Sequence, residues 1–394
     1  MDMQWMKRID RVAGWPLCGA LRAHALVAAP SNSKMGRPLP DAPRIGVIKF
    51  WGMGSLVLAA PAFNALRRAF PRAEIHLLSL APNRRIVELM GIADRLHLLD
   101  LPPRTAAVGP AILRYFRGLP GLGLDAVIDL EYLSRFSAIV SYLTRAPVRV
   151  GFHSWDLWRG NLLTDRRAFN PYWHITDNFL SLARALTGDT APADESVAFR
   201  IGPEDEAAAE AKLAAAGIAP GAPFIAVNPN ASTMALARRW PVENFVALLD
   251  RIEQAGLPPA ALIGSPDEAA YGERVRAAAR RPDRVFNLAG RLNLAELIAA
   301  LRRARLLVTN DSGPLHLAGA LGVPTVSLFG PETPALFGPR GDRHIVLYRG
   351  IDCSPCISIY NAKTVRCMRG RPECLTGIGV DEVFAAVTRA LEAR

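Results

Sequence analysis

The sequence predicts an α/β protein made of two doubly wound halves, and three observations lead to that class. The chain has 394 residues, more than one hydrophobic core usually organises, so two domains are expected. Half of the residues are hydrophobic and 21% are charged, a globular balance that excludes a disordered or fibrous chain. From residue 44 onward, short apolar runs alternate with longer segments of helical period, which is typical of βαβ units and a parallel sheet.

The first half alternates strands and helices up to about residue 150. Short apolar runs mark its strands, which we expect at residues 45–50, 74–79, 95–99, 125–130 and 148–150. Longer amphipathic runs mark its helices, which we expect at residues 55–70, 83–90 and 133–144. Before the first strand, a proline-rich polar stretch at residues 30–43 indicates a linker.

A second half of the same kind follows an alanine-rich helical connector at residues 204–216. Its expected strands are residues 224–228, 260–263, 285–287, 306–309 and 325–328. Its expected helices are residues 242–255, 268–280, 294–303 and 312–321. In such a pair of domains, a ligand binds outside the carboxyl ends of the strands and faces the cleft between the halves.

The charge pattern narrows the class of partner. The formal net charge is +11, and only five of the 47 basic residues are lysine. An arginine-rich excess suits fork-like binding of phosphates or anionic lipid head groups, although a basic solvated surface is an equal alternative. No Lys/Arg-rich block appears, so no nucleic-acid partner is expected. No apolar run approaches the roughly 18 residues of a membrane-spanning helix.

The N-terminal segment, residues 1–29, allows two interpretations. Its basic residues and two tryptophans suit the surface of an anionic membrane, and an ordinary docking helix fits the same pattern equally well. Arg22 and His24 interrupt its apolar stretch, so it is a poor core for a signal peptide.

Four of the five cysteines fall late in the chain, at Cys353, Cys356, Cys367 and Cys374. The first pair has the two-residue spacing of a zinc knuckle, but that spacing is not repeated in the second pair. A metal site, one or two disulfides, and reduced structural thiols all remain open.

The most specific motif spans residues 309–320, where a buried strand ends and a helix opens near Ser312. The first N–H groups of such a helix are unpaired and attract an anion, and Gly313 lets that anion approach the backbone. The alternative is a well-capped helix, with Asp311 or Ser312 as its cap and His316 packed in the core.

A second polar group follows the strand at residues 224–228. Ser232, Thr233 and Arg238 offer hydroxyls and a guanidinium that suit a diphosphate, and a solvated surface loop is the alternative. Gly264 and Glu268 follow the next strand, where the carboxylate either holds a ribose hydroxyl or caps a helix.

In the first half, Gly52 and Gly54 lie in a turn after the first strand and permit close approach of a ligand. Asp129 and Glu131 end the strand at residues 125–130. Two carboxylates one residue apart at a strand end are not both expected to be buried, so at least one should face the cleft, where it is able to act as a general base. Helix capping or a salt bridge to Arg135 is the alternative.

Together these motifs resemble glycosyltransferase family 9, the ADP-heptose:lipopolysaccharide heptosyltransferases and their relatives. The resemblance covers about residues 44–383. It is carried by the glycine turn with Pro61 and the residues Phe70-Pro71-Ala73-Glu74-Ile75, by Arg238-x-Trp240-Pro241, by Asn310-Asp311-Ser312-Gly313-Pro314-x-His316-x-Ala318, and by Gly322-Val323-Pro324 with Leu328-Phe329-Gly330-Pro331.

The resemblance implies the GT-B fold, two facing Rossmann-like domains with a C-terminal helix that returns to the N-terminal domain. We therefore expect an extension and linker at 1–43, an acceptor domain at 44–200, a nucleotide-sugar domain at 201–380 and a crossover helix at 381–394.

The resemblance also assigns roles to the donor site. The diphosphate ligands are Ser232, Thr233 and Arg238, and the amides of Ser312 and Gly313 complete the cradle. Asp311 contacts the donor sugar, the Gly264 loop with Glu268 lies near the nucleoside, and His316 belongs to the same motif. No metal and no cofactor are implied, because cationic side chains and a helix terminus neutralise the leaving nucleotide.

One position departs from the family pattern. The glycine turn normally ends in an aspartate taken to be the catalytic base, and Ser55 stands there instead. Either Glu131, which we favour, or Asp129 supplies the base, or the protein is a non-catalytic binder of nucleotide sugars. A sugar-nucleotide epimerase is disfavoured, because it calls for an acidic pair that residues 315–318 lack.

The expected function is that of an inverting, metal-independent glycosyltransferase. Its donor is a nucleotide sugar, most simply an ADP-sugar that carries heptose or a similar sugar, and its acceptor is a lipopolysaccharide-type glycolipid or another surface glycan. We expect the protein in the cytoplasm, in peripheral contact with the inner membrane.

Overall fold

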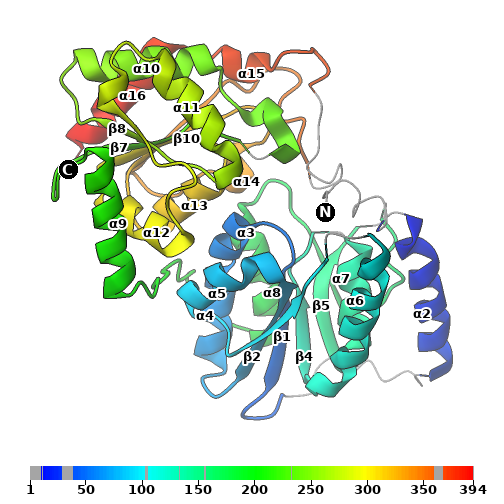
Figure 1. Ribbon diagram of the computed structural model, residues 1–394. Coiled ribbons are helices and arrows are strands. Elements are labelled where there is room, and N and C mark those ends of the chain that lie inside the picture. Colours follow the sequence, from blue (N-terminus) through cyan, green and yellow to red (C-terminus); the bar gives the residue numbers. More distant parts are fainter. Residues whose placement is uncertain are drawn as a thin grey trace. The chain divides into compact units, whose positions relative to one another are not determined.

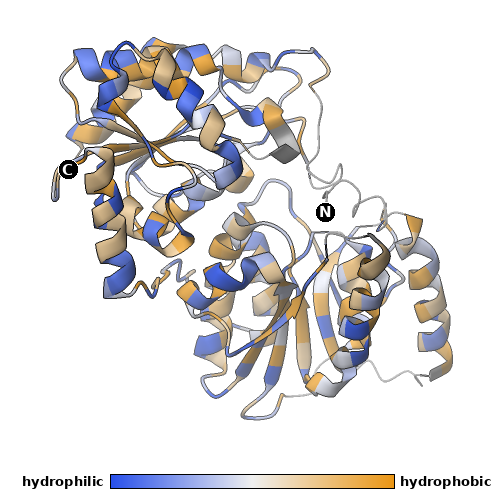
Figure 2. Ribbon diagram, in the orientation of Figure 1, coloured by the Kyte–Doolittle hydropathy of each residue, from blue (hydrophilic) through white to orange (hydrophobic). Residues whose placement is uncertain are grey.

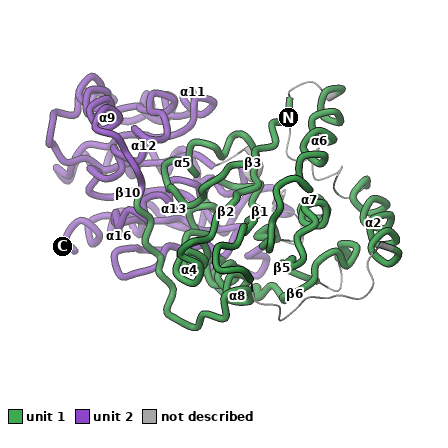
Figure 3. Tube along the Cα trace, turned by 90° about the horizontal axis from the view of Figure 1, so that it is seen from below, with its two compact units in different colours: residues 1–198 green, residues 199–394 purple. Residues whose placement is uncertain are grey.

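The structure is a computed structural model that describes residues 10, 12–28, 39–102, 105–132, 134–154, 157–231, 233–358 and 367–393. The chain divides into two compact units, residues 1–198 and 199–394 (Figure 3). Each unit contains one parallel sheet with helices on both faces (Figure 1). The predicted α/β class with two parallel sheets is therefore confirmed. No helix in the described part of the chain is long and apolar enough to cross a membrane.

Unit 1 contains a six-stranded sheet in the order β3-β2-β1-β4-β5-β6. Its strands are β1 (Arg44–Ile48), β2 (Glu74–Leu80), β3 (Arg95–Leu99), β4 (Ala126–Asp129), β5 (Val148–His153) and β6 (Asp165–Ala168). Its helices are α2 (Gly14–Ala28), α3 (Met53–Leu58), α4 (Ala60–Ala69), α5 (Arg84–Met90), α6 (Thr105–Gly118), α7 (Arg135–Leu143) and α8 (Ile175–Thr187). Helices α6 and α7 cover one face, and α4, α5 and α8 cover the other (Figure 1).

Strand β1 lies at the centre of this sheet and is buried on both faces. Ile45, Val47 and Ile48 are at most 1% exposed, as expected for a strand between two helical layers. Gly46 is required by packing, because a Cβ atom there would lie only 2.7 Å from a methyl group of Leu124. The apolar run at residues 45–50 therefore forms the central strand that carries the first glycine turn at its carboxyl end.

Unit 2 repeats the same topology, with strand order β12-β11-β10-β7-β8-β9. Its strands are β7 (Ile225–Asn228), β8 (Ala260–Leu262), β9 (Val285–Asn287), β10 (Leu306–Asn310), β11 (Thr325–Phe329) and β12 (His344–Tyr348). Its helices are α9 (Pro203–Ala216), α10 (Val242–Gln254), α11 (Ala269–Ala278), α12 (Leu294–Arg303), α13 (Gly313–Ala320), α14 (Pro334–Phe337), α15 (Glu373–Thr376) and α16 (Val380–Glu392). Numbered within each unit, both sheets have the order 3-2-1-4-5-6 of dinucleotide-binding folds.

The C-terminal helix α16 packs within unit 2. Val383 and Val387 are fully buried in the core of this unit, in contact with α10 and β11. Each buried valine contributes about 1.5–3 kcal/mol relative to an exposed one. The buried face of α16 therefore makes this helix part of unit 2.

Six of the elements given above were not predicted, namely α6, α8, β6, β12 and the short helices α14 and α15. Strand β6 has the sequence Asp-Arg-Arg-Ala, and its residues are largely exposed at the edge of the sheet. An edge strand pairs with a neighbour on one side only and is partly exposed to solvent. It therefore lacks the continuous apolar run that identified the central strands in the sequence. Helix α6 contains Pro110, which argued against a helix on local grounds.

Candidate active site

Both sheets have a topological switch point, where the strand order reverses, between β1 and β4 in unit 1 and between β7 and β10 in unit 2. Doubly wound sheets bind ligands outside the carboxyl ends of the strands at such a point. Asp129 ends β4, while Asn228 and Asn310 end β7 and β10. Asp129 thus lies at the switch point of unit 1, and Asn228 and Asn310 lie at the switch point of unit 2.

In unit 2, the buried side chain of Asn310 holds the two loops of the switch point together. Its Oδ1 accepts a hydrogen bond from the Trp240 amide at 3.0 Å. Its Nδ2 donates to the carbonyl oxygens of Pro229 at 3.2 Å and Asn230 at 3.0 Å. Since Asn310 has no exposed surface, these bonds replace those to water and fix the backbone around the site.

Arg238 and Asp311, both predicted donor ligands, are in direct contact. The Nη1 atom of Arg238 lies 3.0 Å from Oδ2 of Asp311, and their side chains are only 17% and 7% exposed. The Nε atom of Arg238 is buried and has no hydrogen-bond partner. Because a buried unpaired N–H group costs free energy, its presence here fits a group that gains a partner from a ligand.

The loop from Asp311 to Gly313 connects β10 to α13. Ser312 occupies the N-cap position, but its hydroxyl does not cap the helix. That hydroxyl accepts from Nδ2 of Asn228 at 2.9 Å and lies 2.9 Å from the hydroxyl of Thr309. The side chain of Ser312 is thus engaged with the ends of β7 and β10. What this position offers an anion is therefore the amide groups that begin α13, together with the helix dipole.

The other predicted donor residues fall into three groups. Ser232 lies outside the described residues, and Thr233 begins a 3₁₀ turn over Thr233–Arg238. Glu268 accepts hydrogen bonds from the amide and hydroxyl of Ser265 at 2.8 and 3.0 Å, which is the helix-cap alternative for this carboxylate. His316 lies on α13, where its ring centroid is 6.5 Å from that of Phe337.

Gly264 is explained by close packing. A Cβ atom at this position would lie 2.6 Å from Nδ2 of Asn230, which in turn donates to the carbonyl of Ile263. Asn228 and Asn230 were not assigned to the site from the sequence, yet they link β7, the end of β8 and β10. The sequence feature that could have indicated these two residues is an amide side chain at the end of a strand, or just beyond it.

Arg239, which directly follows Arg238, is the second of the two arginines that the sequence offered for a diphosphate. Its guanidinium lies 4.0 Å from the ring centroid of Tyr271, and its Nε is buried without a hydrogen-bond partner. Burial raises the pKa of Tyr271, and the charge of Arg239 opposes that rise. The only signal for Arg239 in the sequence was its place beside Arg238.

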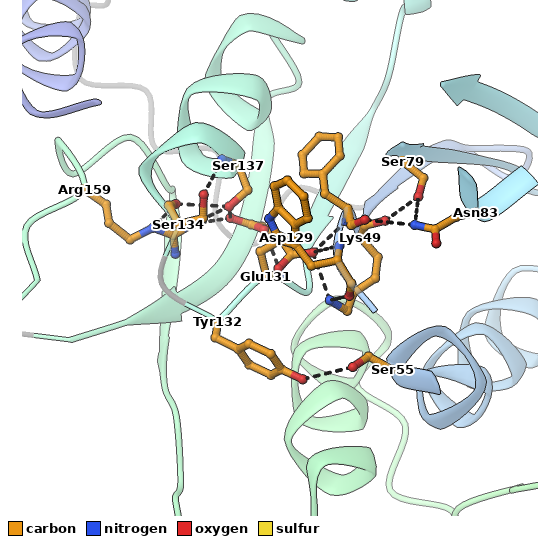
Figure 4. Close-up of polar contacts among 12 residues, drawn as sticks. Lys49, Ser55, Ser79, Asn83, Asp129, Glu131, Tyr132, Ser134, Ser137 and Arg159 are labelled. Atoms are coloured by element: carbon orange, nitrogen blue, oxygen red, sulfur yellow. Dashed lines mark hydrogen bonds and ion pairs between the residues drawn. The ribbon is translucent and has the colours of Figure 1, made fainter. Parts of the chain in front are cut away.

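In unit 1, the switch point is organised around Glu131 (Figure 4). Its Oε1 accepts from Nζ of Lys49 at 2.9 Å, from the Phe50 amide at 2.6 Å and from the Trp51 amide at 3.0 Å. Nζ of Lys49 also donates to the carbonyl of Trp51 at 2.6 Å. Glu131 therefore fixes the backbone that leads into the glycine turn, where Gly52 adopts a φ of 84°.

Asp129 lies deeper than predicted and has partners on both carboxylate oxygens. Oδ1 accepts from the Glu131 amide at 3.0 Å, while Oδ2 accepts from the hydroxyl of Ser137 at 2.8 Å and from the guanidinium of Arg159. Burial raises the pKa of Asp129, and the charge of Arg159 opposes that rise.

The expectation that at least one of these carboxylates faces open space is wrong. Asp129 is 0% exposed and Glu131 is 2% exposed. Both are buried because each has its own cation, Arg159 for Asp129 and Lys49 for Glu131, together with backbone amide donors. The carboxylate of Asp129 thus has no exposed surface and is held by Arg159, Ser137 and the Glu131 amide. The alternative of a salt bridge to Arg135 is not what the structure shows for these two carboxylates. Asp129 pairs with Arg159, and Glu131 pairs with Lys49.

Ser55, on α3, lies next to Tyr132, and their hydroxyl oxygens are 3.4 Å apart (Figure 4). The Tyr132 ring stacks on Phe179, and Nζ of Lys49 lies 5.2 Å from its centroid. Tyr132 directly follows Glu131 in the chain. Ser55, which stands where the family pattern has an aspartate, therefore lies against the segment that carries Glu131. The structure brings Ser55, Tyr132 and Glu131 to one switch point.

Comparison with known proteins places these observations in a family. The model of glycosyltransferase family 9 (heptosyltransferase) matches residues 112–364. Lipopolysaccharide heptosyltransferase 1 of Pseudomonas aeruginosa is 30% identical over 336 residues, which cover 80% of this chain and 86% of that protein.

Two solved structures share the fold. The ADP-heptose lps heptosyltransferase II of E. coli has a TM-score of 0.69 at 21% identity, with 88% of this chain and 98% of that chain covered. The E. coli heptosyltransferase WaaC with ADP-2-deoxy-2-fluoro heptose has a TM-score of 0.65 at 18% identity, with 88% and 99% covered. The family match extends over more than half of the chain, and this protein is therefore a glycosyltransferase that belongs to family 9, the heptosyltransferase family.

Proposed function

We propose that this protein transfers heptose or a similar sugar from an ADP-sugar to a lipopolysaccharide-type glycolipid or another surface glycan, with inversion and without a catalytic metal ion. Family membership supports the reaction class, and the relative from Pseudomonas aeruginosa is a lipopolysaccharide heptosyltransferase. The ADP-sugar in the similar E. coli structure supports the choice of donor. The observation that carries the proposal is Arg238, held by Asp311 beside the first amides of α13.

The chemistry requires a leaving diphosphate to be stabilised. An acceptor hydroxyl attacks the anomeric carbon from the side opposite the diphosphate, a new C–O bond forms, and the bond to the phosphate oxygen breaks. The electron pair of that bond leaves with the diphosphate, whose charge Arg238 and the amides of Ser312 and Gly313 stabilise. Arginine stays protonated in a closed site, so its charge is available when the leaving group forms.

The proton of the acceptor hydroxyl needs an acceptor of its own. Ser55 has no basic oxygen at neutral pH, and Asp129 is fully buried. Glu131 lies at the same switch point, and its three described hydrogen bonds all fall on Oε1. We therefore propose Glu131 as the base. The alternative is that Glu131 only positions the glycine turn, and the pH dependence of turnover distinguishes these two roles.

Donor binding and transfer test the proposal in two steps. A thermal-shift panel of ADP-, GDP-, UDP- and CDP-sugars identifies the donor, because a ligand that binds only the folded state raises Tm. Transfer with the selected donor and a membrane glycolipid extract, followed by NMR of the product, then gives the anomeric configuration. Stabilisation by an ADP-sugar and a product of inverted configuration are expected. Stabilisation only by a nucleotide sugar other than an ADP-sugar would overturn the proposed donor. A product that retains the anomeric configuration would overturn the proposed inversion.

We also propose that α2 brings the protein to the cytoplasmic face of the inner membrane. One side of α2 docks on unit 1, where Gly14 and Cys18 are buried against α7 and the loop that follows β5. The carboxylate of Asp10 accepts from the amides of Phe136 at 2.6 Å and Arg135 at 3.2 Å, at the start of α7. These contacts attach one side of α2 to unit 1.

The other side of α2 remains apolar and exposed. The large exposed side chains of α2 and of Val12, which precedes it by two positions, form this apolar face, with exposures from 41% to 89%: Val12, Trp15, Leu17, Leu26 and Val27. Apolar residues recur along this helix (Figure 2). Residues 11–40 contain four basic and no acidic residues, which suits anionic lipids. An exposed apolar face with such a charge pattern is typical of a helix that lies in a membrane interface.

A further inference from the structure

The turn between β6 and α8, residues 170–174 and here called the aromatic turn, exposes two large aromatic side chains. Tyr172 is 87% exposed and Trp173 is 51% exposed. Among the described residues, Trp15 of α2 is the only other Phe, Tyr or Trp side chain that is more than half exposed. Rings of this size contribute strongly to stability when they are buried, so a pair of them left in solvent indicates an interaction surface.

A buried asparagine on α8 holds the backbone of the aromatic turn. Asn178 is 1% exposed, and its Oδ1 accepts from the Asn170 amide at 2.9 Å. Its Nδ2 donates to the carbonyl oxygens of Asn170 at 2.9 Å and Trp173 at 3.2 Å. Oδ1 of Asn170 in turn accepts from the Tyr172 amide at 2.9 Å. The backbone that carries both rings is therefore already ordered, so a ligand that binds there pays little ordering entropy.

Contacts on both sides of the aromatic turn tie it to the segments around Ser55. After the turn, the hydroxyl of Thr176 donates to the carbonyl of Leu58 at 3.1 Å, and Leu58 ends α3, the helix that carries Ser55. Before the turn, the ring of Phe169 meets that of Tyr132 edge to face, with their centroids 5.9 Å apart. The hydroxyl of Tyr132 lies 3.4 Å from that of Ser55 (Figure 4). The aromatic turn therefore lies at the same end of the sheet as the switch point of unit 1.

The sheet order gives the distance between the aromatic turn and the switch point. Strand β6, which leads into the turn, is separated from β4 by β5 alone. Neighbouring strands lie about 4.8 Å apart, so the ends of β4 and β6 are roughly 10 Å apart. A ligand that contacts both the switch point and the aromatic turn therefore has to be extended, as a chain of sugar rings is.

The surface chemistry of this region suits a saccharide that carries anionic groups. Strand β6 presents two exposed arginines, Arg166 and Arg167, against one carboxylate, Asp165, which pairs with Arg167 at 2.9 Å. The excess positive charge favours phosphate or carboxylate substituents. The C–H face of a sugar ring packs on an aromatic ring, while the hydroxyls at its edge stay in water. Lipid chains, in contrast, match an exposed face that is largely aliphatic, such as that of α2.

We propose that the aromatic turn is a saccharide-binding subsite, where the rings of Tyr172 and Trp173 stack on sugar rings of the acceptor that neighbour the ring to be modified. That this saccharide is the acceptor rests on the proposed function. The two rings touch the substrate away from the reacting atoms, so they contribute equally to binding in the ground state and in the transition state. Such binding lowers KM for the acceptor and leaves kcat nearly unchanged.

Binding of a lipid-free saccharide to the full-length protein tests this inference. The probe is the water-soluble saccharide fraction that mild acid releases from the membrane glycolipid extract, and calorimetry gives its apparent Kd. Tyr172→Ala and Trp173→Ala should each raise this Kd by about 3- to 10-fold, the range of an aromatic contact. Trp173→Phe should keep most of the affinity, because it retains a ring. Both side chains are more than half exposed, so the variants should keep the Tm of wild type.

A matched variant and a lipid probe separate the saccharide from other ligands. Leu113→Ala removes an apolar side chain that is 48% exposed on α6 of the same unit, and it should leave the saccharide Kd unchanged. The double variant Tyr172→Ala/Trp173→Ala should sediment with vesicles of phosphatidylcholine and phosphatidylglycerol as wild type does. Loss of vesicle binding at unchanged saccharide affinity would make the aromatic turn a membrane contact and overturn the inference. Equal saccharide affinity of wild type and double variant, or no saccharide binding by wild type, also overturns it.

Donor affinity, measured on the same preparations, distinguishes a failure of this inference from a failure of the proposed function. Normal ADP-sugar binding together with a saccharide affinity that does not depend on Tyr172 and Trp173 rejects only the subsite. Saccharide binding that depends on both rings, in a protein that binds no ADP-sugar, rejects only the donor assignment. In transfer assays, the double variant should show a raised KM for the acceptor at a nearly unchanged kcat and donor KM.

Discussion

Arg238 and Asp311 form an ion pair of 3.0 Å at the carboxyl end of β10, so the main cation of the proposed donor site is already held by a carboxylate of the same chain. Asp311 keeps the guanidinium in place, while Nε of Arg238 stays without a hydrogen-bond partner. A diphosphate that enters this site meets an oriented cation with an unsatisfied N–H group. The two members of the pair therefore have different roles in binding, and substitutions separate them.

Replacement of Arg238 by alanine should weaken ADP-sugar binding by about 1.5–3 kcal/mol, the value of a hydrogen bond to a charged group. Arg238→Lys should keep part of the affinity, because it retains the charge but loses the planar fork. Calorimetry gives both values. Arg251→Ala is the control, since Arg251 pairs with Asp381 elsewhere in unit 2. Equal donor affinity in wild type and Arg238→Ala would remove Arg238 from the site.

Replacement of Asp311 by asparagine should distinguish ADP from an ADP-sugar. If Asp311 accepts a hydrogen bond from the sugar, the variant loses about 1.5–3 kcal/mol of ADP-sugar affinity, the value of a bond to a charged group. ADP alone should bind at least as well as to wild type, because a negative charge next to the diphosphate is gone. Parallel titrations with the two ligands measure this difference, and an equal loss for both would show that Asp311 only holds Arg238.

Replacement of Glu131 by glutamine should lower turnover by roughly 10²–10⁴-fold if Glu131 is the base. The acidic limb of the pH–rate profile should then disappear, whereas a purely positioning role leaves the limb in place at lower activity. Donor affinity should stay nearly unchanged. Asp129→Asn is the matched control, because it removes the buried carboxylate that pairs with Arg159. This variant should lower the free energy of unfolding by about 3–5 kcal/mol without changing the pH–rate profile.

Ser55→Asp completes this experiment. It restores the carboxylate that the family pattern places in the glycine turn, within reach of Tyr132. If wild type binds the donor but transfers nothing, and Ser55→Asp transfers, the non-catalytic interpretation is correct. If wild type is active, Ser55→Asp combined with Glu131→Gln should recover part of the activity that Glu131→Gln loses.

Substitution of the exposed apolar face of α2 should release the protein from anionic vesicles. The variant Val12→Ser/Leu26→Ser/Val27→Ser changes residues that are at least 65% exposed, so the fold should keep its Tm. We expect wild type to sediment with anionic vesicles at low salt and to dissociate in part as salt screens the charges. Cys18→Ser, on the docked side, is the control. Unchanged sedimentation of the triple variant would refute the membrane role of α2.

Glu74 should make the stability of unit 1 depend on acid pH. Hydrogen bonds from Arg95 and His76 lower its pKa from 4.5 to about 2. A depressed folded-state pKa stabilises the folded state above the unfolded value, and this contribution is lost as the pH falls from 4.5 towards 2. The difference in unfolding free energy between wild type and Glu74→Gln should therefore shrink over this range. Urea denaturation at several pH values measures it, and a constant difference would contradict the shift.

Much of the fold was predictable because central strands of parallel sheets are buried on both faces. The runs at residues 45–50 and 306–309 are apolar for that reason, and they form the inner strands β1 and β10. Strand β6 and the proline-containing helix α6 escaped prediction, since an exposed edge strand and an interrupted helix lack such a local signal. The end of a strand was the most useful local signal for the site, because backbone groups and polar side chains emerge there together.

The sequence by itself determined the α/β class, the family resemblance, and the segments that carry the site, since apolar period and motif spacing are local properties. Only the tertiary structure decided what each polar side chain contacts. It buried Asp129 against Arg159, tied Glu131 to the glycine turn through Lys49, and paired Arg238 with Asp311. These contacts join residues 30 to 82 positions apart, and whether a carboxylate is buried or free depends on the cation that such long-range packing supplies.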